Sequence, residues 1–263
     1  MRTISLTTDF GVADWFVGAM KGVILGIQPR ANIVDLSHEI PPGDIRAGAF
    51  VLAVSCRFFP KKTVHVVVVD PGVGSERRAI AAQTMNGFFV GPDNGVLSWA
   101  LARERIKAVH QITNRGLFLH PVSNTFHGRD IFAPVAANLS KGLPIGKVGA
   151  PIKEFLRLDW PEPRRGANSI KGEILYIDRF GNANTNIDGA ALPSLAESSC
   201  EIFLKRKRLC ALRAFYQAVA RGQPTAVPGS SGFLELAVNG GSAAQNFNLK
   251  VGEEVIVRVR SCF

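Results

Sequence analysis

The chain has 263 residues, of which 46% are hydrophobic and 20% are charged, and its formal net charge is +10. These values are ordinary for a globular protein with a sizeable core, and the length fits one large domain or two smaller ones. No apolar run approaches the roughly 20 residues needed to span a bilayer. The first residues also lack the apolar core and cleavage site of a signal peptide. A cytoplasmic protein with no membrane partner is therefore expected.

The positive charge favours anionic ligands or polyanions. The basic residues are scattered, however, with local clusters only at Arg164 and Arg165 and over residues 205–208, and no nucleic-acid-binding motif accompanies them. A solvated basic surface without a nucleic-acid partner is therefore favoured over an RNA-binding module, which would need an aromatic platform. The cysteines form no Cys-x-x-Cys pair and receive no role; they are Cys56, Cys200, Cys210 and Cys262.

The first third of the chain alternates strand and helix patterns. Residues 3–8 and 33–36 predict strands, and each is followed by a helical pattern, capped by Asp14 and Asp44 respectively. Residues 63–69 predict a further strand, buried on both faces. This βαβαβ order predicts a parallel sheet with right-handed crossovers. It lacks the glycine pattern of a dinucleotide site and the lysine of a P-loop.

Two predicted strands end in a carboxylate, Asp9 and Asp70. Asp70 is followed by a Pro-Gly-x-Gly turn, residues 71–74, and then by Arg77 and Arg78. Open α/β sheets bind ligands beyond the carboxyl ends of their strands, and glycine allows the backbone to approach a ligand closely. Asp70 is therefore a candidate site residue. The alternative is that it only caps a turn, and this stretch alone does not decide between the two.

The pattern then changes to a hairpin and two helices. Residues 79–83 and 88–90 flank Asn86 and Gly87, which predicts a hairpin. Helical patterns follow at 96–101 and from 125 to 139. His127 lies at the start of the second helix beside a glycine, where its ring would face a cleft. A lone histidine is more often structural, so a functional His127 remains one of two interpretations.

The second half of the chain is rich in strand patterns. Prolines gather over residues 151–170, which predicts a linker, residues 156–170, between an α/β domain, residues 1–155, and a second domain, residues 171–263. A helix is expected around residues 209–219. The remaining patterns predict a small antiparallel β-barrel or sandwich, with strands over residues 172–177, 201–204, 232–238 and 254–259.

Three polar clusters interrupt this second domain, at residues 178–186, 228–233 and 239–243, and Glu235 follows the second of them. Each alone would be a hairpin turn. Together they combine Asn, Ser and Gly with Phe180, Phe233 and Glu235. An aromatic face beside amide donors and acceptors is what a purine pocket requires.

Six motifs, in order, carry a resemblance to a known family. They are Thr8-Asp9-Phe10-Gly11, Val69-Asp70-Pro71-Gly72-Val73-Gly74, Pro92-Asp93-Asn94-Gly95, Phe126-His127-Gly128-Arg129-Asp130, Asp178-Arg179-Phe180-Gly181-Asn182 and Asn239-Gly240-Gly241-Ser242-Ala243. The chain resembles, nearly end to end, the S-adenosyl-L-methionine (SAM) hydroxide adenosyltransferases, or SAM hydrolases, which are related to a fluorinase and a chlorinase.

The resemblance implies a fold and a reaction. The fold is an amino-terminal parallel-sheet α/β domain plus a small carboxy-terminal antiparallel β-barrel. The implied assembly is a homotrimer, with each site between the amino domain of one subunit and the barrel of its neighbour. In the implied reaction, water or hydroxide displaces methionine at C5′ of the ribose and gives adenosine and L-methionine, with no cofactor and no metal.

The resemblance also implies residue roles. Asp9 accepts the ribose hydroxyls. Asp70, Arg77 and His127 hold and activate the attacking water, and Arg77 rather than Arg78 has the family's spacing from the aspartate. A carboxylate at position 70 would repel a halide, so the chain looks hydrolytic rather than halogenating.

The implied substrate contacts in the second domain divide into two groups. Phe180 packs on the adenine, Asn182 reads its edge, and Asn239 and Gly240 offer backbone contacts to it. The candidates for the methionine end are Asp178, Ser230 and Glu235.

A metal-dependent phosphohydrolase is the alternative, because five potential ligands lie near predicted strand ends. They are Asp9, His38, Asp70, Asp93 and His127. Metal-ligand spacing such as His-x-x-x-His is absent, so this alternative is the weaker one.

Overall fold

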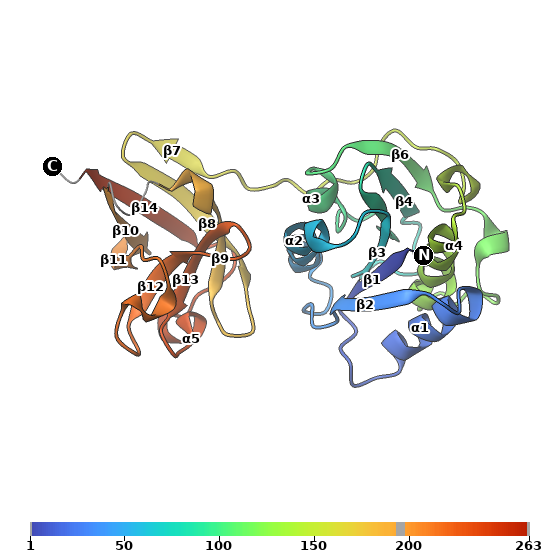
Figure 1. Cartoon of the computed structure of the whole chain (residues 1–263), viewed down its shortest axis with the longest axis horizontal. Coiled ribbons are helices and arrows are strands. Elements are labelled where there is room, and N and C mark those ends of the chain that lie inside the picture. The colour runs from blue at the N-terminus through green and yellow to red at the C-terminus, as the bar shows by residue number, and fades with distance from the viewer. Residues whose placement is uncertain (1, 193–197, 262–263) are drawn as a thin grey trace. The chain divides into compact units, whose positions relative to one another are not determined.

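The computed structural model describes residues 2–192 and 198–261 and divides into two compact units, Met1–Leu158 and Asp159–Phe263 (Figure 1). Cys262 lies outside the described residues. Within the segment expected to be a linker, β7 (Arg164–Gly166) pairs with β8 (Ser169–Ile177). The last proline of the segment is Pro163, so the chain regains its N–H donors there and forms a short hairpin.

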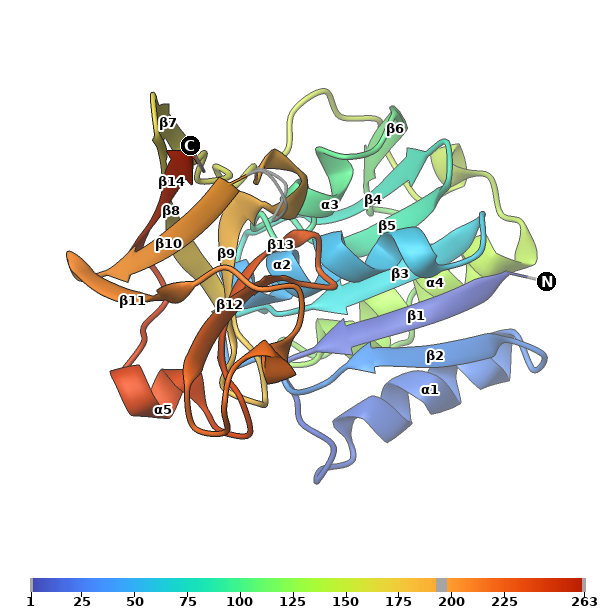
Figure 2. The same cartoon turned by 60° about the vertical axis from the view of Figure 1, so that its left-hand side comes forward.

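The first unit contains one six-stranded sheet in the order β2-β1-β3-β5-β4-β6. Strand β1 pairs in parallel with β2 and β3, and β3 with β5, which confirms the predicted parallel sheet. Figure 2 shows β1, β2 and β3 side by side with their arrowheads at one edge. The bounds are β1 Thr3–Thr8, β2 Asn32–Ser37, β3 Thr63–Val68, β4 Ala79–Thr84, β5 Gly87–Pro92 and β6 Ile106–Gln111.

Antiparallel pairing extends this sheet on one side. Strands β4 and β5 form the predicted hairpin, and β6 adds antiparallel to β4. Strand β6 was not predicted. Its sequence, Ile-Lys-Ala-Val-His-Gln, is short, and only two of its six residues, Ile106 and Val109, are β-branched.

Helices cover both faces of the sheet. Helix α1 (Phe16–Ile27) packs against α4 (Ala133–Lys141) over a core that includes Leu6 and Val66. Helix α2 (Ile45–Ser55) packs against α3 (Ser98–Leu101) on the other face, where Val69 lies against Gly48 of α2 (Figure 1). A π-helical turn, Gly128–Phe132, leads into α4. Among the described residues, no helix is long and apolar enough to cross a membrane.

One of the two predicted helix caps is confirmed. Asp44 Oδ1 accepts a hydrogen bond of 2.9 Å from the backbone N–H of Ala47 at the start of α2. The prediction of Asp14 as the cap of α1 is wrong, because Trp15 holds that position without a side-chain hydrogen bond. The Trp15 ring stacks on Phe16 with 4.6 Å between centroids. Aromatic packing rather than a carboxylate therefore accompanies the start of α1.

The second unit is an antiparallel sheet in the order β11-β10-β14-β8-β9-β13-β12, with β7 beside β8. A bridge between Leu212 and Ala226 brings its two ends together, so the sheet is nearly closed and the predicted barrel is confirmed. A short helix, α5 (Ala243–Phe247), precedes β14. The remaining bounds are β9 Ala183–Asp188, β10 Ser198–Leu204, β11 Lys207–Ala211, β12 Pro224–Pro228, β13 Phe233–Val238 and β14 Glu254–Ser261.

The helix expected around residues 209–219 is wrong. Residues up to Ala211 belong to β11, and only Tyr216–Ala218 form a single 3-10 turn. Cys210 and Leu212 both point into the barrel core. Their spacing of two residues is the period of a strand rather than of a helix.

Replacing Leu6, fully buried on β1, with alanine is expected to lower the free energy of unfolding by about 2–5 kcal/mol, because the lost side chain leaves a cavity. The matched variant Leu25→Ala, at a position 43% exposed on α1, is expected to change it by about 0.5 kcal/mol or less. Urea denaturation measures both values. Equal effects of the two substitutions would contradict the described core.

Candidate active site

The loop after β3 contains Val69 and then Asp70, and it returns the chain to β4. The backbone carbonyl of Asp70 accepts the N–H of Val73 at 3.1 Å, so the turn is closed by the backbone and the carboxylate is left for another partner. Gly74 has a φ of +79°, and a Cβ there would lie 2.2 Å from the carbonyl oxygen of Asn124. Glycine is therefore required for this loop to pack against the segment that carries His127.

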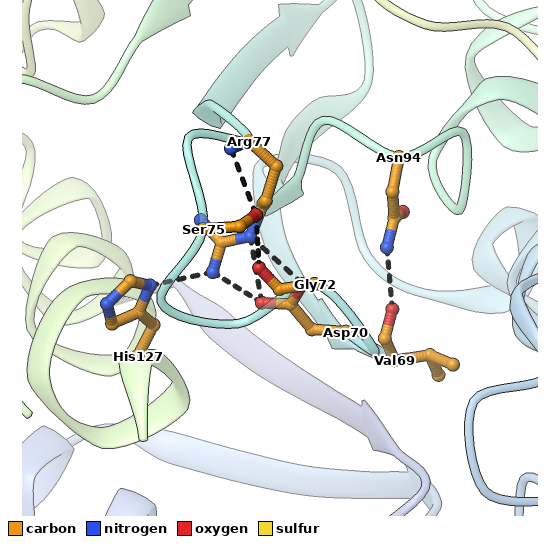
Figure 3. Close-up of polar contacts among 7 residues, drawn as sticks. All are labelled: Val69, Asp70, Gly72, Ser75, Arg77, Asn94 and His127. Carbon is orange, nitrogen blue, oxygen red and sulfur yellow. Dashed lines mark hydrogen bonds and ion pairs between the residues drawn. The ribbon is translucent and has the colours of Figure 1, made fainter. Parts of the chain in front are cut away.

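The carboxylate of Asp70 is held by Arg77 (Figure 3). Arg77 Nε lies 2.9 Å from Oδ1 and 3.0 Å from Oδ2, and Arg77 Nη2 also donates to Oδ2. Only 4% of the Asp70 side chain and 11% of the Arg77 side chain are exposed. Arg78 points elsewhere and pairs with Asp93 at 2.5 Å. Arg77 is thus the arginine that contacts Asp70.

The same guanidinium reaches His127. Arg77 Nη2 lies 2.7 Å from His127 Nδ1 (Figure 3). Because a guanidinium only donates, Nδ1 must accept, and the ring is neutral with its proton on Nε2. Burial and then the Arg77 charge lower the pKa of His127, against opposing effects of Asp70 and Asp130. The geometry and the electrostatics both favour a neutral imidazole.

Asp9 lies at the end of β1 and shares a cavity of about 420 Å³ with Asp70 and His127. The backbone N–H of Gly43 donates to Asp9 Oδ2 at 2.8 Å, which leaves Oδ1 without a bond to that loop. Burial raises the pKa of Asp9, and the nearby Asp70 carboxylate adds to this, although the Gly43 hydrogen bond opposes it. The cavity wall also includes Phe10, Phe16 and Phe126.

The residues suggested as metal ligands do not converge. Asp93 binds Arg78, and His38 lies between Thr8, 2.8 Å from Nδ1, and Asp35, 3.0 Å from Nε2. Over residues 2–192 and 198–261, no group of three or more His, Cys, Asp or Glu could hold a metal ion. The described geometry gives no support to the phosphohydrolase alternative.

The second unit carries its own pocket, of about 840 Å³, between the turns of the barrel. All seven substrate-binding residues predicted in this unit line it. They are Asp178, Phe180, Asn182, Ser230, Glu235, Asn239 and Gly240. The structure therefore gathers the predicted residues into two sets, each within its own unit.

The turn at residues 178–182 is fixed by its own aspartate. Asp178 Oδ1 accepts the backbone N–H groups of Phe180 and Asn182, both at 2.9 Å. Gly181 has a φ of +81°, and a Cβ there would lie 2.0 Å from Ser242 Oγ. The Phe180 ring is 77% exposed, so it presents an apolar face that nothing within the described unit covers.

Glu235 is the buried carboxylate of this pocket, with 5% of the residue exposed. Its Oε1 accepts a hydrogen bond of 2.6 Å from the hydroxyl of Tyr216, and Asn182 lines the same pocket. Burial raises the pKa of Glu235, the Tyr216 hydrogen bond opposes this, the Asp178 carboxylate adds to it, and the nearby Asn182 side chain opposes it to a smaller extent. Burial and Glu235 also raise the pKa of Tyr216, which keeps its hydroxyl proton as a donor.

Five lining residues of this pocket were not predicted as site residues: Phe215, Tyr216, Gln217, Val238 and Gly241. The first three fall in the segment wrongly expected to be a helix. Asn239 holds the end of this segment in place, because its Nδ2 donates a hydrogen bond of 2.8 Å to the carbonyl of Val219. Adjacent aromatic residues between two strand patterns were the available signal.

Comparisons with known proteins agree with this layout. The family model described as the SAM hydroxide adenosyltransferase N-terminal domain matches residues 4–149, and the model of the C-terminal domain matches residues 172–256. A Salinispora tropica protein named (R)-S-adenosyl-L-methionine hydrolase is 42% identical over 97% of each chain. A fluorinase from Actinoplanes sp. is 28% identical over 97% of this chain and 96% of its own.

A solved structure shares the fold. The crystal structure of a conserved protein from Thermotoga maritima is 38% identical and has a TM-score of 0.91 over 97% of this chain and 99% of its own. With both domain models matched in order over most of the sequence, the chain belongs to the SAM hydroxide adenosyltransferase family.

Proposed function

We propose that this protein hydrolyses SAM to adenosine and L-methionine. The observation that carries the proposal is the Arg77 bridge between Asp70 and His127. This arrangement supports a site that orients a water molecule and accepts its proton. The relative from Salinispora tropica, named a hydrolase of the same substrate, supports it as well.

The reaction is an in-line displacement at C5′ of the ribose. A bond forms between the water oxygen and C5′ while the C5′–S bond breaks, and its electron pair returns to sulfur. The sulfonium becomes the neutral thioether of methionine, so the leaving group needs no acid. One proton must leave the water, and the protein's task is to orient the nucleophile and accept that proton.

The three residues divide this task. Asp70, held by Arg77, accepts a hydrogen bond or the proton from the water. His127, with its proton on Nε2, donates a hydrogen bond to the oxygen and fixes its direction. Arg77 stabilises the hydroxide-like charge as the proton leaves. A carboxylate at this position would also repel fluoride or chloride, which favours hydrolysis over halogenation.

The remaining residues bind the substrate. Asp9 accepts the two ribose hydroxyls, since a carboxylate has only acceptors. Phe180 packs on the adenine, while Asn182 and the backbone of Asn239 and Gly240 read its edge. Asp178, Ser230 and Glu235 face the methionine end, where an ammonium needs a carboxylate and a carboxylate needs donors.

We also propose the assembly and location that the resemblance implies. Three copies form a homotrimer in which the amino-terminal unit of one subunit completes its site with the barrel of its neighbour. The free cysteines Cys56, Cys200 and Cys210 fit a reducing compartment and support the cytoplasm as the location.

The variant Asp70→Asn is expected to lower kcat for SAM hydrolysis by about 10³-fold, because it keeps the shape but removes the proton acceptor. Chromatographic quantification of adenosine and methionine measures the rate. Asp188→Asn is the matched control, since Asp188 caps a short turn in the other unit and asparagine caps as well. Failure of the wild-type protein to form adenosine would refute the function, and full activity of Asp70→Asn would refute only the role.

The pKa of His127 is expected to lie below its ordinary value of 6.5, and the neutral ring is expected to carry its one proton on Nε2. The neutral ring is the form present above the pKa, so the contribution of His127 to activity is lost only as the pH falls below that value. Nitrogen-15 NMR of the histidine rings, assigned with His127→Gln, reports both the pKa and the tautomer. A proton on Nδ1 would contradict the Arg77 contact.

Subunit mixing tests the shared site. Asp70→Asn and Asn182→Ala each disable one half, so each variant alone is expected to be weakly active. In mixed trimers they are expected to regain about a third of the wild-type sites, because a trimer that contains both variants pairs two intact halves at one of its three interfaces. No recovery in mixed trimers, isolated through two different tags, would mean that each chain completes its own site.

A further inference from the structure

The buried ring of His38 joins the end of β1 to the end of β2. The residue is only 4% exposed. Its Nδ1 lies 2.8 Å from the hydroxyl oxygen of Thr8, the last residue of β1, and its Nε2 lies 3.0 Å from Asp35 Oδ1. The second oxygen of Asp35 accepts a hydrogen bond of 2.6 Å from Lys21 of α1. Both nitrogens of the ring therefore have a side-chain partner.

These contacts have a defined direction. An ionised carboxylate only accepts, so the neutral His38 ring carries its proton on Nε2 beside Asp35, and Nδ1 accepts from the Thr8 hydroxyl. The oxygen of that hydroxyl accepts the backbone N–H of Phe10 at 3.3 Å. The Thr8 hydroxyl thus links the His38 ring to the backbone on the far side of Asp9.

The backbone around His38 holds the same segment. The carbonyl of His38 accepts the N–H of Gly11 at 2.8 Å. Five residues further on, the N–H of Gly43 donates to Asp9 Oδ2 at 2.8 Å. The chain is therefore tied to His38 on both sides of Asp9, and Gly43 fixes the direction of the carboxylate itself.

We propose that His38 is a positioning residue that acts through Thr8 to place the Asp9 carboxylate for the two hydroxyls of a ribose. The site thereby selects a ribonucleoside over a nucleoside without those hydroxyls. The inference rests on the proposed function in that Asp9 accepts the ribose hydroxyls. Asp9 lines the cavity of the first unit, whereas neither His38 nor Thr8 is among the described residues that line it, so both act on a ligand through Asp9.

The shape of a ribose makes the placement of Asp9 decisive. Two neighbouring hydroxyls reach the oxygens of a single carboxylate only when that carboxylate has one position and one orientation. Hydrogen bonds weaken steeply once their length or angle departs from the normal range. A small backbone shift at Asp9 therefore weakens both bonds to the ribose together, and it leaves the contacts to the base unchanged.

The test compares the calorimetric affinities for adenosine and for 2′,3′-dideoxyadenosine, which lacks both hydroxyls. The wild-type protein is expected to bind adenosine about 100-fold more tightly, because two hydroxyls donate to a charged acceptor. Thr8→Val removes the linking hydroxyl and is expected to reduce this preference about tenfold. Thr7→Val is the matched control. Thr7 is equally buried and its hydroxyl has no hydrogen-bond partner among the described residues, so the preference is expected to remain.

Two substitutions of His38 separate its ring nitrogens. Asparagine places its amide near the position of Nδ1, whereas glutamine places its amide near that of Nε2. His38→Asn can still accept from Thr8 and is expected to keep the preference within about twofold, while His38→Gln is expected to reduce it about tenfold. In an Asp9→Ala background, His38→Gln is expected to have no further effect on the preference, because the group through which it acts is gone. A merely structural role would lower both affinities together and leave their ratio unchanged.

Several outcomes overturn the inference. An unchanged preference in Thr8→Val or in His38→Gln does so, and so do equal losses within either matched pair. A wild-type protein that binds neither nucleoside, or both alike, overturns it as well. If Thr8→Val does not fold, the two His38 variants decide.

Binding separates this inference from the proposed function, since it needs no turnover. A protein that shows the expected changes in preference without hydrolysing SAM would retain the inference and lose the proposed function. A protein that hydrolyses SAM but keeps its preference in Thr8→Val would do the reverse.

Discussion

The ion pair between Asp70 and Arg77 is the interaction on which the amino-terminal half of the site depends. Both side chains are largely buried, so removing either would leave a charge without its partner, which costs more than the pair itself contributes. The guanidinium also lies over the Phe132 ring, with 5.4 Å between Cζ and the centroid. One residue therefore joins a strand end, a histidine and the start of α4, and the neutral state of His127 follows from the same contact.

The two units contribute different chemistry. The first concentrates charge: Asp9, Asp70 and His127 line one cavity in which burial changes the pKa values of Asp9 and His127 in opposite directions. The second provides an exposed aromatic ring and amide groups, held by bonds from side chains to the backbone of their own turns. In the proposed hydrolysis the first surface orients the nucleophile and takes up its proton, and the second recognises the substrate.

The sequence predicted what is encoded locally. The β-branched run before Asp70, the cap at Asp44 and the turn around Gly87 each depend on neighbouring residues, and all agree with the structure. The errors have a common origin. Trp15 begins α1 beside aromatic partners distant in the chain, and residues 207–211 form a strand because β10 pairs with them. Tyr216 was missed because its partner Glu235 lies 19 residues away in the sequence.

The segment between the barrel bridge and β12 has a further consequence. Its first residue, Arg213, donates its N–H to Ala226 at 2.8 Å, and its last, Gln223, accepts the N–H of Asn239 at 3.1 Å. Both ends are thus anchored in backbone pairing, while Phe215 and Tyr216 between them line the pocket. The side chains of residues 213–223 can therefore change, and with them the lining of the pocket, while the backbone pairing at both ends holds the neighbouring strands in register.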